Sequence, residues 1–178
     1  MSILPRRMSA KIEGDFVVFL IGAQLNTWWK LGQFKWLGDA MNGMIRELEQ
    51  RPESGFLGHE AWLSLRPVMI QYWRSSEQLL EYARSRDATH YPVWVHFNKE
   101  LAKRKDIGIW HETYLVQANN YECVYNNMPR FGLAKVAQSI EAQGKHTSAQ
   151  GRLGRSDGSD APILPSGEER AKVGSPGY

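Results

Sequence analysis

The chain has 178 residues, a length typical of one sizeable domain. Its composition, with 42% hydrophobic and 23% charged residues, is that of a globular protein. The formal charge of +3 comes from scattered basic residues nearly balanced by carboxylates, so it gives no reason to expect nucleic acid as a partner. The single cysteine, Cys123, excludes an intramolecular disulfide and a cysteine-based zinc site. One unpaired cysteine suits a reducing cytosol, and we expect a cytoplasmic protein.

The first strand is predicted just after a polar N-terminal segment. Residues 1–14 show little apolar periodicity, and we expect an arm that is loose or reaches a partner subunit. The β-branched and aromatic run from Phe16 to Ile21 then predicts a buried strand over residues 15–24. This run is far shorter than the roughly 20 residues that cross a bilayer, and no small-residue cleavage motif follows it. We therefore expect neither a membrane segment nor a secretion signal.

A long helix and a hairpin follow. Apolar residues at spacings of three and four predict a helix from a cap at Asn26 or Thr27 to about Gln50. Its glycines at 32, 38 and 43 each cost up to about 1 kcal/mol relative to alanine, so packing must hold the helix together or it breaks near Gly38. Residues 56–73 alternate around the turn Arg66-Pro67, which predicts a β-hairpin.

The second half of the domain repeats the alternation of helix and strand. A helix capped by Ser75 or Ser76 is expected to end near Asp87, and another starts at Thr89. Apolar and aromatic positions of that second helix fall on one stripe, which comprises His90, Val93, Trp94, Phe97 and Leu101. Residues 107–117 predict a strand, and residues 121–126 a short extended segment.

This order, β-α-β-β-α-β, predicts an α+β domain of the ferredoxin-like type, with helices on one face of an antiparallel sheet. We place the domain at residues 15–136. Its other sheet face would be bare and apolar, so we expect two copies to dimerise face to face as a dimeric α/β barrel that encloses a cavity. Residues 137–178 are rich in Gly, Pro and Ser and are expected to be disordered.

Two histidines, His90 and His111, are the main candidate site residues. A neutral histidine is the usual nitrogen ligand of haem iron, and a second one opposite could move protons. The two are 21 residues apart, a separation that one helix and one returning strand span. Alternation along the strand puts His111 and Glu112 on opposite faces, so only one of them can face a shared pocket. A histidine that is merely hydrogen-bonded within the core remains the alternative.

His59 is a weaker candidate, because its alternating strand position also fits a simple cross-strand contact. A zinc site built from His59, His90 and His111 is conceivable, but no HExxH or paired-cysteine spacing supports it. A GxSxG elbow, a P-loop and a GxGxxG after a strand are all missing from the sequence. Serine hydrolases and nucleotide-dependent enzymes therefore rank low.

Several segments, taken as a set, carry a family resemblance. They are Tyr72-Trp73-Arg74-Ser75 up to Leu79, Thr89-His90, Trp110-His111-Glu112-Thr113-Tyr114, and Tyr121-Glu122 to Asn127-Met128-Pro129. Over about residues 15–136 the chain resembles the af470-like monooxygenase family of the dimeric α/β-barrel superfamily. That resemblance implies oxygenation of a natural product, in a superfamily that includes both cofactor-free and haem enzymes.

A more distant likeness is to the haem-dependent aldoxime dehydratases, which resemble two such domains fused. Their helix also begins with a Thr-His pair, and their strand also carries Trp-His-Glu. By that likeness His90 is the proximal iron ligand and His111 the distal acid or base. Arg74 or Arg86 would pair with a haem propionate, and Trp94 would contribute to the cofactor site from the same stripe as His90.

The leading hypothesis is a homodimeric, haem-binding oxidoreductase of monooxygenase type that acts on a small apolar or aromatic metabolite. In it His90 is the metal ligand and His111 or Glu112 is catalytic. A lyase that dehydrates an aldoxime or related N–O compound is the first alternative. A cofactor-free monooxygenase and a non-catalytic module that binds a hydrophobic ligand are the others.

Overall fold

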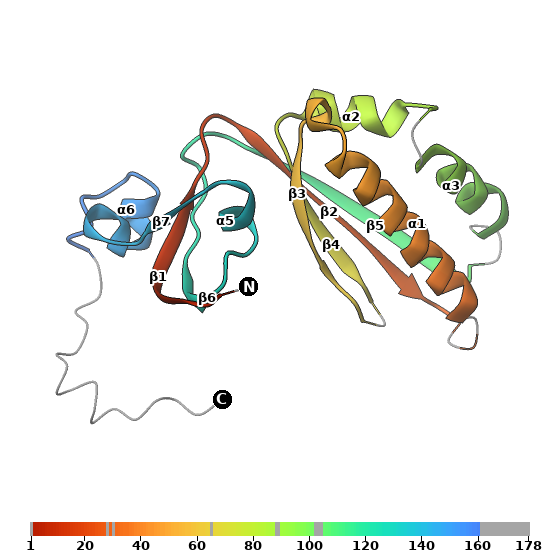
Figure 1. The fold of residues 1–178 in the computed structure, drawn as a ribbon, viewed down its shortest axis with the longest axis horizontal. Helices are drawn as coiled ribbons and strands as arrows, with labels where there is room; N and C mark the ends of the chain where they lie inside the picture. The colour runs from red at the N-terminus through yellow and green to blue at the C-terminus, as the bar shows by residue number, and fades with distance from the viewer. Residues whose placement is uncertain are drawn as a thin grey trace.

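The computed structural model describes residues 2–27, 29, 31–64, 66–87, 90–101 and 105–160. The elements follow the predicted alternation closely (Figure 1). In chain order they are β1 (Leu4–Lys11), β2 (Phe16–Leu25), α1 (Leu31–Glu49), η1 (Pro52–Ser54), β3 (Phe56–Trp62), β4 (Val68–Trp73), α2 (Ser76–Arg84), α3 (His90–His96), the π-helical η2 (Phe97–Leu101), β5 (Ile107–Val116), β6 (Tyr125–Met128), α5 (Leu133–Val136), β7 (Gln138–Glu141), η3 (Gly144–Thr147) and α6 (Ala149–Arg152).

The larger sheet has the strand order β3-β4-β2-β5, and every neighbouring pair is antiparallel. With its helices it forms the β-α-β-β-α-β unit, so the prediction of a ferredoxin-like α+β fold is confirmed. Gly38 does not interrupt α1, which runs unbroken to Glu49. None of the helices in the described part of the chain has both the length and the apolar character that a bilayer crossing requires.

Helices α1, α2 and α3 pack on one face of this sheet, which we call the helix side. Ile45 and Leu48 of α1 and Leu79 of α2 form a buried cluster with strand residues that include Val17 and Trp73. Trp73 is only 1% exposed, and its indole N–H donates to Gln71 Oε1 at 3.0 Å. Truncating a buried tryptophan to alanine costs about 3–5 kcal/mol, so this cluster anchors both helices to the sheet.

The opposite face bears none of α1, α2 and α3, and we call it the helix-free face although the short α5 covers its end around Tyr72. One close contact on this face requires glycine. Gly22 of β2 pairs with Trp110 of β5, and a Cβ at Gly22 would come within 2.6 Å of the Trp110 indole. The absent side chain therefore lets the indole lie across the sheet against the β2 backbone.

A smaller sheet, with the order β6-β1-β7, stands beside the larger one (Figure 1). Its central strand β1 lies in the expected N-terminal arm, and it pairs with strands from the other end of the chain. The expected disorder from residue 137 is wrong as far as residue 160, because β7 pairs with β1 and η3 and α6 follow it. The rest of that expected tail, residues 161–178, lies outside the described residues.

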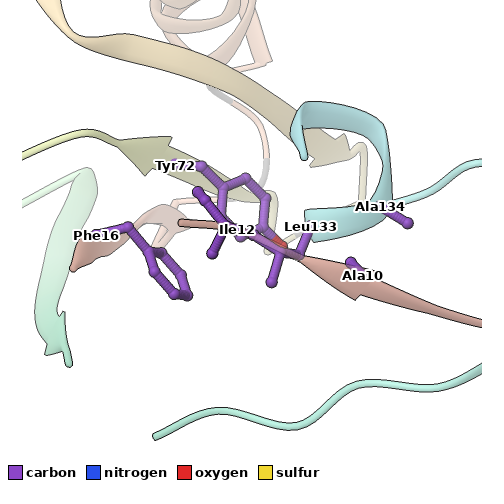
Figure 2. Packing of buried hydrophobic residues seen from close by; sticks show 6 residues of the cluster. All are labelled: Ala10, Ile12, Phe16, Tyr72, Leu133 and Ala134. Carbon is purple, nitrogen blue, oxygen red and sulfur yellow. The ribbon is translucent and has the colours of Figure 1, made fainter. Parts of the chain in front are cut away.

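A buried cluster joins the two sheets (Figure 2). Ala10 and Ile12 come from β1 and its end, Phe16 and Tyr72 come from the larger sheet, and α5 adds Leu133 and Ala134. The turn before α5 has Gly132 at φ 56° and ψ −129°, and a Cβ there would lie 3.2 Å from the Tyr72 hydroxyl oxygen. Burial raises the pKa of Tyr72, so its hydroxyl stays neutral within the cluster.

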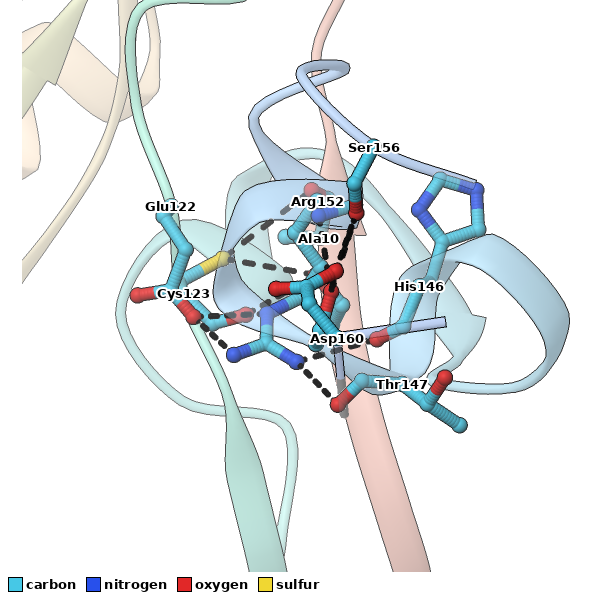
Figure 3. A network of polar contacts seen from close by, with 11 residues as sticks. Ala10, Glu122, Cys123, His146, Thr147, Arg152, Ser156 and Asp160 are labelled. Carbon is cyan, nitrogen blue, oxygen red and sulfur yellow. Dashed lines mark hydrogen bonds and ion pairs between the residues drawn. The ribbon is translucent and has the colours of Figure 1, made fainter. Parts of the chain in front are cut away.

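Arg152 holds the C-terminal segment against the smaller sheet (Figure 3). Its side chain is 5% exposed, and its Nε donates to Glu122 Oε1 at 2.6 Å. Its Nη1 donates to the carbonyl oxygens of His146 and Thr147 at 2.9 and 3.1 Å. The buried guanidinium donates to three oxygen acceptors, and these charge-assisted hydrogen bonds stabilise a segment that is poor in apolar residues.

Replacing Gly22 with alanine should destabilise the protein by about 1–3 kcal/mol, because the new methyl group overlaps the Trp110 indole. Gly43→Ala in α1 is the matched control, since a Cβ there meets open space and should add up to about 1 kcal/mol of stability. Urea unfolding of both variants measures the difference. Equal midpoints for Gly22→Ala and the parent chain would contradict the contact.

Arg152→Gln should loosen the C-terminal segment by on the order of 3 kcal/mol, because Glu122 loses its buried partner. Hydrogen exchange at the Ala142 amide, which donates to the Arg7 carbonyl at 2.9 Å, reports on that opening. The control is Arg155→Gln, whose Nη2 donates a long, exposed hydrogen bond of 3.5 Å to Asn120 Oδ1. Unchanged exchange at Ala142 in Arg152→Gln would refute the anchoring role.

Candidate functional site

His111 lies on the helix side of β5, at a place that the helices leave open. It pairs with Ile21, and its imidazole centroid is 5.6 Å from that of the Phe19 ring. Both Phe19 and Ile21 pack against the helix-side cluster, so His111, which lies beside them, is on the helix side of the sheet as well. His111 is exposed, as are Ile109 and Leu115 on the same face, which are 36% and 69% exposed. An accessible imidazole thus stands on an uncovered strip that is apolar except for Thr113, which pairs with Phe19.

Glu112 points to the opposite, helix-free face. It pairs with Leu20, and its Oε2 accepts a hydrogen bond of 2.6 Å from the Tyr114 hydroxyl. This hydrogen bond and the carboxylate charge raise the pKa of Tyr114. The sheet itself separates Glu112 from His111, so the structure does not bring these two predicted catalytic residues together within one chain.

His90 is the first residue of α3, and its side chain lies outside the described part of the chain, as does all of Thr89. Trp94, one turn further along, is 59% exposed and stacks on Tyr91 with 6.4 Å between ring centroids. Phe97, at the end of the same helical run, packs with Ala23 and Ile107. The helix therefore lies over the helix side of the sheet, the side on which His111 stands.

Arg74 contacts the backbone between β1 and β2, and its pairing with a propionate stays a prediction. Its Nη1 donates to the Glu13 carbonyl oxygen at 2.8 Å and to that of Asp15 at 3.5 Å. Arg74 follows Trp73, which lies in the same cross-strand row as Leu115, so it stands near the C-terminal end of β5. It fastens the connection between the two sheets, whereas Arg86 is exposed in the turn after α2.

His59 cannot share a metal ion with His111. It lies on β3, two intervening strands away from β5, which at about 4.8 Å per strand separates the two residues by roughly 14 Å. Burial, followed by the charge of Lys135, lowers the pKa of His59. Within the described residues no group of three or more His, Cys, Asp or Glu side chains is arranged to hold a metal ion.

A groove of about 530 Å³ opens between α1 and the tip of the β3–β4 hairpin. Ile21, Ala23 and Met69 form its floor, and Met41 lines its side. The groove adjoins the His111 face, because Ile21 pairs with His111 and because Ile109, two residues from His111, also lines it. Sequence reasoning missed the groove, although the glycines of the long helix, which have no side chains to fill space, were a visible signal.

Comparisons with known proteins agree with this architecture. The model of the family described as monooxygenase af470-like matches residues 16–133. A search of the curated proteins found no match. Among solved structures, an aldoxime dehydratase superposes with a TM-score of 0.58 at 19% identity, covering 76% of this chain and 44% of that chain. Aldoxime dehydratase OxdRE in complex with butyraldoxime gives 0.58 at 17% identity, covering 76% and 43%.

These structural likenesses concern the fold, since the identities are low and the chain spans less than half the length of either dehydratase. The family match runs from the first residue of β2 to the first residue of α5, so it takes in the whole larger sheet and its helices. The chain belongs to the af470-like monooxygenase family.

Proposed function

We propose that the protein is a haem-binding oxidoreductase of monooxygenase type that acts on a small apolar or aromatic molecule at the helix side of β5. The observation that carries the proposal is the exposed imidazole of His111 on an open apolar strip beside a groove of about 530 Å³. Membership of a monooxygenase family supports the reaction class.

The residues on the helix side fit a haem. A porphyrin has two broad apolar faces, and the exposed side chains of Ile109 and Leu115 offer an apolar surface with Phe19 beside the imidazole. His90 would hold the iron from α3, and His111 would stand on the sheet opposite. When bound, haem supplies a redox-active iron for oxygen or peroxide chemistry.

The work of the chain's own residues is positioning and proton transfer. His111 can take up or release a proton at a ring nitrogen, which is the usual part of a positioned histidine in acid–base catalysis. Phe19 and Ile21 back the imidazole and limit the water that reaches it from the side of the core. Glu112 has no part in this site within the same chain, because it stands on the helix-free face.

We further propose that the protein works as a homodimer that covers the helix-free face. Trp62 and Trp110 are each 40% exposed and Tyr114 is 52% exposed, and a cross-strand row places Gly22 and Val68 between the two tryptophans. An apolar and aromatic sheet face of this kind is typical of an interface. A second copy would bury it and leave the helix side open to substrate.

A lyase reaction on an N–O compound is the second candidate. It is favoured by the superposition on the two aldoxime dehydratases, one of them in complex with butyraldoxime. Because this chain spans less than half of either dehydratase, groups from a second chain would have to complete such a site. Conversion of butyraldoxime to butyronitrile by dithionite-reduced protein without oxygen would favour the lyase over the oxygenase.

His90→Ala should abolish the Soret band of the haem-loaded protein, because the variant lacks the proposed iron ligand. His59→Gln is the matched control and should keep the band, since His59 lies on β3 far from β5. An unchanged band in His90→Ala would overturn the ligand assignment.

His111→Ala should keep haem but lower peroxide-dependent oxidation of the test substrate guaiacol by about 100-fold, a typical contribution of a positioned acid or base. Absorbance at the Soret maximum confirms equal loading of the two proteins. Equal rates in His111→Ala and the parent chain would remove His111 from catalysis.

Tyr114→Asp should convert the dimer to a monomer, because it places a second carboxylate beside Glu112 on the helix-free face. Leu115→Asp is the matched control, since the next residue of the strand points to the helix side and is 69% exposed. Light scattering after size-exclusion chromatography measures the mass. A monomeric parent chain, or equal dissociation of both variants, would contradict this interface.

A further inference from the structure

The groove beneath α1 is kept open by a glycine. Gly38 lines it, and a Cβ built on Gly38 would meet nothing within 4 Å. Glycine inside a helix costs about 1 kcal/mol relative to alanine, and nothing in the local backbone requires one here. Any side chain at position 38 beyond a methyl group would extend into this space.

The mouth of the groove carries charges that cancel. Lys35 Nζ lies 2.6 Å from Asp39 Oδ2, one helical turn apart, and both side chains are mostly exposed. Asn42 continues the same helix face and also lines the groove. These side chains offer hydrogen-bond donors and acceptors without a net charge, so the mouth suits a polar but uncharged end of a ligand.

The interior of the groove is apolar. Ala23, Leu37 and Met69 are buried there, and Met41, which is partly buried, packs against the helix-side cluster. A volume of about 530 Å³ falls in the range of pockets that hold small organic molecules. An occupant therefore presents an apolar or aromatic body to the floor and one neutral hydrogen-bonding group to the mouth.

The geometry points to this groove as the binding site of a small, uncharged, mainly apolar molecule, with Gly38 setting the bulk that the site admits. Its floor residue Ile21 pairs with His111, so a bound molecule lies along the face on which the imidazole stands. The identification of this molecule with the substrate rests on the proposed function, whereas binding itself does not.

The test uses the full chain as purified, with and without added hemin, and the neutral fluorescent probe N-phenyl-1-naphthylamine. Gly38→Phe should weaken probe binding by about tenfold or more, because a phenyl ring takes up the apolar space of the groove. Gly43→Phe is the matched control: its Cβ also meets open space, but Gly43 does not line the groove. Equal weakening by both variants would overturn the proposal.

Methyl NMR of methionine-labelled protein locates the probe without any mutation, and it decides the matter even if Gly38→Phe fails to fold. The methyl signals of Met41 and Met69, which line the groove, should shift on saturation with the probe. The signal of Met8, buried in β1, should not shift. Unchanged Met41 and Met69 signals at saturation would refute the site.

The two proposals fail separately. Probe binding at Met41 and Met69 in a protein that takes up no haem would retain the groove and reject the haem enzyme. A Soret band in a protein whose Met41 and Met69 signals do not shift with the probe would retain the haem enzyme and reject the groove.

Discussion

The unbroken antiparallel pairing of β2 with β5 decides which side chains of this protein can act together. Ten consecutive pairs run from Phe16 with Val116 to Leu25 with Ile107. Because side chains alternate across a strand, this register puts His111 on the helix side and Trp110 and Glu112 on the helix-free face. A slip by one residue would exchange them, and the Trp110 indole, seated on Gly22, opposes that slip.

The two faces of the sheet consequently suit different tasks. On the helix side, an imidazole, an apolar strip and a groove adjoin one another, which is an arrangement for chemistry on an apolar molecule. On the helix-free face, aromatic side chains surround a carboxylate–tyrosine hydrogen bond, and the half nearer α5 is already covered by the cluster around Tyr72. The uncovered half is the part available to a second copy. In both places a glycine, Gly38 or Gly22, shapes the surface by the side chain that it lacks.

Much of the fold was predictable because the spacing of apolar residues within each short segment indicates its helix or strand. The strand run at Phe16 to Ile21 and the helical spacing up to Gln50 each depend on residues close in sequence, and strand alternation alone separated His111 from Glu112. The C-terminal segment was not predictable in this way. Its folding depends on Arg152 meeting Glu122 and on β7 pairing with a strand more than a hundred residues earlier. The carbonyl partners of Arg74 could not be predicted either, because Glu13 is 61 residues away in the sequence.

The most direct test of haem binding is the ultraviolet-visible spectrum of protein expressed with a haem precursor, measured together with iron content per subunit. We expect a Soret band and close to one iron per subunit, because each chain carries its own His90 and its own open helix-side face. A protein with no Soret band, even after reconstitution with hemin, would contradict the haem enzyme and leave a cofactor-free oxygenase or a binding module at the same groove.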